Sequence, residues 1–170
     1  MRAEGKFLGT LCSAALFLST MAPAVTESVA QLQARFDAET DSVRKVKIIV
    51  KLGDAQFEAA RHAEKEGDNN TAGFTMEKYR DNVRAALEAL KKQHPDAEKQ
   101  SNGFRQLEFH ARKGIREVEE MLLVAPSDYK PPLEIVRTDL LAMENELIKL
   151  LFPRRPAEKH ADTPPPEKQP

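Results

Sequence analysis

Apolar residues recur along most of the chain at intervals of three, four or seven, the spacing of one face of an α-helix. Four segments show this pattern, and each should bury its apolar face against the others. The expected buried positions are Val43, Val46, Val50, Phe57 and Ala60; Ala72, Met76, Tyr79, Val83, Ala86 and Leu90; Leu107, Ala111, Ile115, Val118 and Leu122; and Leu133, Val136, Leu140, Met143, Leu147 and Leu150. No segment alternates with a period of two, so we expect no strand.

Turn-forming residues separate the four segments. Gly67 follows the first and can adopt the left-handed conformation that ends a helix. Pro95 follows the second, and the residue before a proline resists the helical conformation. Pro131 and Pro132 are suited to the first turn of the last helix.

Two boundaries stay open at this level. An earlier helix around Leu32 and Phe36 either breaks near Asp41 or runs on into the first segment. The third helix starts between Pro95 and Phe104. Because 101–103 (Ser-Asn-Gly) is typical of a turn, we expect that helix from Phe104 to about Val124.

The sequence therefore predicts an all-α protein, an antiparallel bundle of about four amphipathic helices over residues 25–152. Residues 153–170 contain 6 of the 11 prolines and no large apolar residue. Such a segment buries too little surface to offset the entropy of ordering, so we expect a disordered proline-rich tail.

The first 24 residues have the parts of a secretory signal peptide. Arg2 and Lys6 precede an uncharged, largely apolar block at 7–21, and the small-residue sequence 22–24 (Ala-Pro-Ala) follows it. We expect cleavage after Ala24 and an exported, periplasmic or secreted protein. Cleavage after Ala30 and retention of the leader as a membrane anchor remain alternatives.

Composition narrows the classes of partner. The chain has 26 basic and 27 acidic residues and a net charge of −1, which gives no electrostatic argument for binding nucleic acid. The single cysteine, Cys12, lies in the leader. The mature protein would therefore lack disulfides and thiolate metal ligands.

Candidate reactive groups are few. His62 has Glu58 and Glu66 one helical turn away on either side, so these three are candidate metal ligands. A solvated face with charge pairs four residues apart explains the same residues, and we favour that interpretation. His110 should lie at the edge of its helix's apolar face. We find no catalytic constellation and no cofactor motif, and expect no enzyme.

Two stretches, at 51–60 (KLGDAQFEAA) and 150–155 (LLFPRR), resemble uncharacterised exported helical proteins of environmental bacteria. The resemblance implies a bacterial periplasmic or secreted setting and a helical bundle. It implies no activity, cofactor or functional residues.

These observations favour a non-enzymatic interaction or scaffold module that binds a protein partner or associates with itself. One alternative is a carrier of a small ligand or metal in the bundle core or at the His62 face. The other is a protein tethered to a membrane surface by an uncleaved leader. The sequence leaves the partner or ligand and the oligomeric state open.

Overall fold

The computed structural model describes residues 27–153, which form five α-helices and one short 3₁₀ helix and contain no strand. The α-helices are α1 (Val29–Ala38), α2 (Ser42–Lys65), α3 (Asn69–Gln93), α4 (Ser101–Val124) and α5 (Lys130–Leu151). The 3₁₀ helix η1 (Ser127–Tyr129) leads directly into α5. The predicted all-α class is confirmed.

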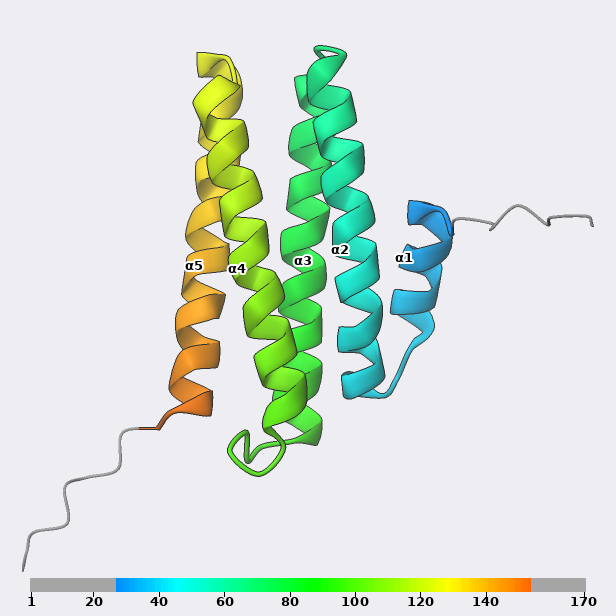
Figure 1. Cartoon of the computed structure of the whole chain (residues 1–170), viewed down its shortest axis with the longest axis vertical. Coiled ribbons are helices and arrows are strands. Elements are labelled where there is room, and N and C mark those ends of the chain that lie inside the picture. Colours follow the sequence, from blue (N-terminus) through cyan, green and yellow to red (C-terminus); the bar gives the residue numbers. More distant parts are fainter. Residues whose placement is uncertain (1–26, 154–170) are drawn as a thin grey trace, which may run out of the picture.

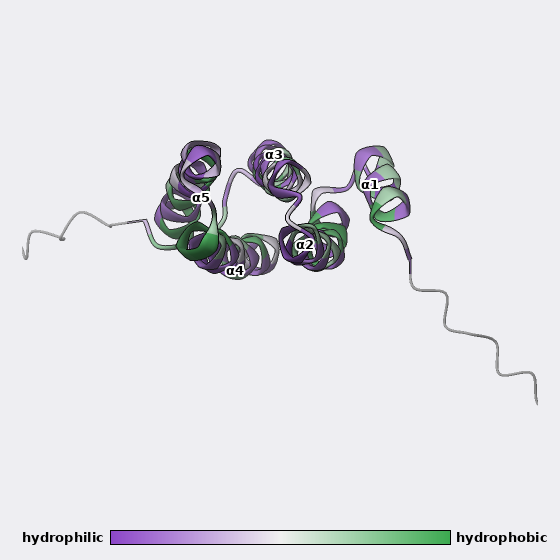
Figure 2. Cartoon of the chain, turned by 90° about the horizontal axis from the view of Figure 1, so that it is seen from above, coloured by the Kyte–Doolittle hydropathy of each residue, from purple (hydrophilic) through white to green (hydrophobic). Residues whose placement is uncertain are grey.

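The four long helices lie side by side and alternate in direction (Figure 1). Seen from above, α2 and α4 form one row and α3 and α5 the other (Figure 2). The most extensive packing joins α2 to α3 and α4 to α5, whereas α2 and α5 lie diagonally opposite, without close backbone approach. The short α1 packs against the outer side of α2.

One continuous apolar core joins these helices. Several of its members have no exposed surface, among them Val46, Leu52, Met76, Val83, Leu90, Leu107, Val118, Val136, Leu140 and Leu147. Most of the predicted positions are buried. The exceptions are only half-buried: Val43, Val50, Leu122 and Leu150. Next to the last two, Met121 and Leu151 are buried instead.

The helical conformation is interrupted between α1 and α2. The described residues therefore contain one α-helix more than the predicted four. Asp41 is the N-cap of α2, and its carboxylate accepts a hydrogen bond from the Arg44 backbone N–H at 2.7 Å. The side chain of Gln93 on α3 holds this connection, because it accepts from the Ser42 N–H and donates to the Thr40 carbonyl.

The third helix, whose start was open between Pro95 and Phe104, begins at Ser101, so the interpretation of 101–103 as a turn is wrong. Gly103 is buried inside the helix rather than in a turn. A Cβ at this position would lie 2.9 Å from Cδ2 of Leu90. The glycine therefore allows α3 and α4 to approach closely.

Other predicted boundaries agree with the structure. Gly67 has a φ of 78° just after α2, in the left-handed region that glycine favours. Asp68 caps α3 by accepting from the Thr71 N–H at 3.0 Å. A proline lies at the start of α5, as the Pro131–Pro132 pair predicted.

The leader with its cleavage site at Ala24, and the tail beyond Pro153, lie outside the described residues. Within residues 27–153, none of the helices combines the length and the apolar character needed to cross a membrane. The predicted domain limits at 24/25 and 152/153 stay predictions.

Candidate functional site

A buried polar cluster joins α2, α3 and α4 near the middle of the core. We call it the Tyr79–His110 cluster; it consists of Asp54 from α2, Tyr79 from α3, and His110 and Lys113 from α4. Tyr79 has no exposed surface and His110 is 3% exposed. Asp54 and Lys113 lie at the outer side, where about half and over a third of their side chains are exposed, respectively.

Hydrogen bonds run through the cluster from the interior to the surface. The Tyr79 hydroxyl donates to the His110 backbone carbonyl at 2.8 Å and lies 3.0 Å from Nδ1 of the same residue. Nε2 of His110 lies 3.2 Å from Oδ1 of Asp54. The Lys113 ammonium donates to that same oxygen at 2.8 Å.

The protonation of His110 decides how these contacts are satisfied. A protonated ring could donate to Tyr79 from Nδ1 and to Asp54 from Nε2 at the same time. The neutral ring reaches Asp54 as a donor only in the Nε2–H tautomer. Nδ1 must then accept from Tyr79, whose single proton is shared with the His110 carbonyl.

Electrostatics favour the neutral ring. Burial lowers the pKa of His110, and the hydrogen bond and charge of Asp54 offset only part of this effect. Partial burial by itself raises the pKa of Asp54, but hydrogen bonds from Lys113 and His110 outweigh it and the pKa is lowered. Burial also raises the pKa of the Tyr79 phenol well above its ordinary value. The phenol therefore stays neutral.

Two glycines make room for the cluster. A Cβ at Gly114 would lie 2.6 Å from the Tyr79 hydroxyl, and one at Gly53 would lie 2.8 Å from Cε2 of the same ring. Phe57 closes the cluster, with its ring stacked against His110 at a centroid distance of 5.6 Å and edge-on to Tyr79 at 4.6 Å. The two glycines thus provide the space that the rings of Tyr79 and His110 occupy, and Phe57 packs against both rings.

The order hydroxyl, imidazole, carboxylate is the one that activates a nucleophile in hydrolases. Here the hydroxyl belongs to a residue with no exposed surface, and its proton faces His110 rather than a substrate. The arrangement fastens three helices to one another through satisfied polar contacts. Its solvent-facing end is the Asp54–Lys113 ion pair.

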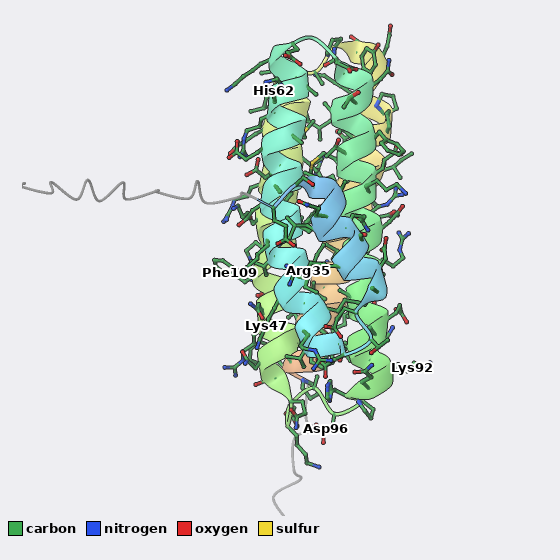
Figure 3. The ribbon with its side chains drawn as sticks, turned by 90° about the vertical axis from the view of Figure 1, so that its right-hand side faces the viewer. Arg35, Lys47, His62, Lys92, Asp96 and Phe109 are labelled. Carbon is green, nitrogen blue, oxygen red and sulfur yellow. The ribbon has the colours of Figure 1, made fainter. Side chains whose placement is uncertain are left out.

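The predicted candidate metal ligands lie elsewhere, near the upper end of α2, where Figure 3 shows His62. Nδ1 of His62 lies 3.2 Å from Glu66, and both side chains are largely exposed. Glu58 pairs instead with Arg61 at 2.6 Å. In the part of the chain that the structure describes, no group of three or more His, Cys, Asp or Glu residues is arranged to hold a metal ion.

Sequence reasoning missed the Tyr79–His110 cluster because it placed His110 at the edge of its helix face; the residue is buried. The available signal was the pair of glycines inside strong helical patterns, one beside Asp54 and one four residues after His110. A glycine in a helix interior is unfavourable unless something approaches it closely. At Gly53 and Gly114 the aromatic rings do so.

Comparison with known proteins adds no identification. No protein family matches this chain, and neither a curated protein nor a solved structure is significantly similar to it.

Proposed function

We propose that the protein is an exported, non-enzymatic interaction or scaffold module that presents helix surfaces to a protein partner. The observation that carries this proposal is the contrast between a sealed polar cluster and exposed apolar side chains. Tyr79 and His110 are closed to solvent, whereas several large apolar side chains remain exposed: Phe74, Phe109, Leu123, Val124, Ile135, Ile148 and Phe152.

Three of these residues lie at one end of the molecule, where α3 begins and α4 ends (Figure 1). Leu123 is 81% exposed, Val124 68% and Phe74 60%. We call these three the upper apolar surface. Beside Phe74, a hollow of about 140 Å³ is lined by Tyr129 and Pro132 among others. Phe74 beside this hollow, and the exposed Leu123 and Val124 at the same end, favour contact with another protein.

An antiparallel helical bundle is suited to this role because it holds such residues on rigid elements. Cross-helix ion pairs join α2 to α4 through Arg61 and Glu117, and α3 to α5 through Arg84 and Asp139. The Tyr79–His110 cluster fixes α2, α3 and α4 together in the interior. The leader pattern of residues 1–24 supports export as the setting.

Site-specific photo-cross-linking tests the proposal. A photoreactive amino acid is placed at Leu123 or Phe74 in the full-length chain, expressed in the organism that encodes it. The matched control carries it at the exposed Lys92, at the opposite end of α3 from Phe74. We expect one discrete cross-linked partner from the first two positions and none from the control. The additional change Val124→Lys should weaken capture through Leu123.

Equal capture from all three positions, or none from the upper apolar surface, would contradict the proposal. Fractionation of the same cells tests the setting. The mature chain should appear in the exported fraction with an intact mass that lacks Met1–Ala24, and a protein retained in the cytoplasm with its leader would contradict export.

A further inference from the structure

The outer face of α5 carries an uncharged ridge that no other described helix covers. We call it the α5 ridge; it consists of Ile135, Thr138, Ala142, Asn145, Ile148 and Phe152, all exposed. Among the helices of residues 27–153, α3, α4 and η1 pack against α5. Figure 2 shows α5 at one edge of the molecule, whereas at the opposite edge α1 covers α2.

The ridge is uncharged because most charged side chains of α5 lie where this helix packs against α3 and α4, and form ion pairs there. Toward α3, Asp139 pairs with Arg84 and Glu146 with Lys91, both at 2.8 Å. Toward α4, Glu144 pairs with Arg112 at 3.1 Å. The remaining outward strip, from Ile135 to Phe152, has the three- and four-residue spacing of a helix–helix contact face.

Two hollows flank the middle of the ridge. One is lined by Glu134, Ile135, Thr138 and Asp139, and the other by Asn145, Ile148, Lys149 and Phe152. Three pairs drawn from the two sets, 135/148, 138/145 and 134/149, are all centred between residues 141 and 142. Asp139 falls level with Glu144 about the same centre, and each of these carboxylates is already paired with an arginine of a neighbouring helix. Reversing the direction of the helix therefore places isoleucine level with isoleucine and acid level with base.

We propose that this ridge is a self-association surface on which two copies of the chain pair through antiparallel α5 helices. A two-fold contact uses the same patch on both copies, so the patch must complement itself. Antiparallel pairing brings Glu134 near Lys149 of the second copy at both ends and opposes the helix dipoles. Parallel pairing would bring like charges together.

The second copy is a better occupant than the chain's own tail. Residues 154–170 contain no large apolar side chain that could cover Ile135 or Ile148. The exposed Ala142 near the centre allows two helix backbones to approach. This inference does not depend on the proposed partner protein, because the upper apolar surface lies on other residues.

Sedimentation velocity tests whether the α5 ridge mediates dimerisation. The sample is the protein expressed from the full-length sequence and purified from the cell, and its intact mass is recorded. One helix pair buries a small interface. We therefore expect reversible dimerisation between about 1 µM and about 500 µM. Ile135→Lys and Ile148→Lys should each raise the dissociation constant at least about tenfold. Phe109→Lys, at an exposed apolar residue of α4 that points away from the helices (Figure 3), should leave it unchanged.

Disulfide trapping tests the orientation, in a Cys12→Ser background with circular dichroism confirming the fold of each variant. In the antiparallel pair, Ala142→Cys lies near the two-fold axis and should form a linked dimer on oxidation. Ile135→Cys lies about 20 Å from its own copy and should not. Mixing Ile135→Cys with Ile148→Cys chains should restore linkage.

Three results would overturn the proposal. The first is a monomer over the whole concentration range, which would leave the ridge to a different protein. The second is a dimer that both lysine variants leave intact, which would place self-association elsewhere. The third is efficient linkage of Ile135→Cys to itself, which would indicate parallel helices.

Discussion

Gly114 and Tyr79 lie so close together that the tyrosine ring occupies the space of a side chain on the glycine. A Cβ at Gly114 would overlap Cε1 of the ring and lie 2.6 Å from its hydroxyl oxygen. The hydroxyl can therefore reach the His110 carbonyl one helical turn before Gly114, at 2.8 Å. The packing of α3 on α4 thus depends on a residue without a Cβ atom at position 114.

Gly114→Ala should destabilise the fold because the added methyl group would overlap the fully buried ring of Tyr79. Overpacking of this kind costs about 1–3 kcal/mol in the free energy of unfolding, measured by urea denaturation. Gly73→Ala is the matched control. Nothing lies within 4 Å of a Cβ there, so alanine in the interior of α3 should stabilise by up to about 1 kcal/mol. Equal effects of the two changes would contradict this account.

Tyr79→Phe should remove the hydroxyl and leave Nδ1 of His110 without its partner. An unsatisfied buried polar group costs about 1–3 kcal/mol, so the free energy of unfolding should fall by that amount. A double-mutant cycle with His110→Leu isolates the contact. We expect a coupling of at least about 0.5 kcal/mol. Strictly additive effects would mean that the contact between the hydroxyl and Nδ1 contributes nothing, since leucine keeps the backbone carbonyl that the hydroxyl also reaches.

Stability should fall as the solution is acidified from neutral pH. Burial lowers the pKa of His110 in the folded state, whereas the unfolded imidazole keeps an ordinary pKa of about 6.5. The unfolded chain then binds the proton more tightly. The contribution is complete above about pH 6.5, is lost as the pH falls toward the folded pKa, and levels off below it.

Urea denaturation at a series of pH values measures this loss. The slope due to one proton is at most about 1.4 kcal/mol per pH unit. Asp54, whose pKa is lowered, contributes separately, and its share is lost only near pH 4 and below. His110→Gln should flatten the region between about pH 5 and pH 7. A gain of wild-type stability on acidification would refute the prediction.

Asp41→Ala should weaken the start of α2. Its carboxylate accepts from the Arg44 N–H at 2.7 Å, and loss of an N-cap costs about 0.5–2 kcal/mol. Asp41→Asn keeps an acceptor and serves as the control, with an expected loss of only a few tenths of a kcal/mol. Both free energies of unfolding come from urea denaturation. An equal loss in the two variants would point to the charge rather than the hydrogen bond.

Periodicity predicted most of this fold because a buried helix face is a local property of the sequence. The positions from Met76 to Leu90 on α3 are an example, since each lies four or three residues from the next and each is buried. Gly67 was equally readable, because its role at the end of α2 depends on its own backbone. The all-α class follows from such signals.

Residues that act across helices were harder to predict. Whether Gly103 marks a turn or a close helix contact depends on Leu90 in another helix. The burial of His110 depends on Asp54 and Tyr79, which are 56 and 31 residues away in the sequence. A periodic pattern contains no information about these partners. The Tyr79–His110 cluster could therefore not be predicted from periodicity, although its glycines and aromatic residues are present in the sequence.

The last prediction concerns α1, which is fastened to α3 by a reciprocal pair of amides. Gln33 donates to Asn82 at 3.1 Å, and Asn82 donates back at 2.9 Å. Asn82→Ala removes both bonds and leaves the apolar contacts of Leu32 and Phe36 in place. We expect α1 to open locally while the other helices stay folded, because α1 is short and lies outside the four long helices.

Hydrogen exchange should then accelerate in residues 29–38, whereas the exchange of α4 amides stays at the wild-type rate. Arg80, which neighbours this site in sequence but pairs with Asp81 and Asp139, provides the control Arg80→Ala, which should leave α1 protection unchanged. If Asn82→Ala accelerates exchange equally in α1 and α4, then α1 is part of the same cooperative unit and not a separately docked helix.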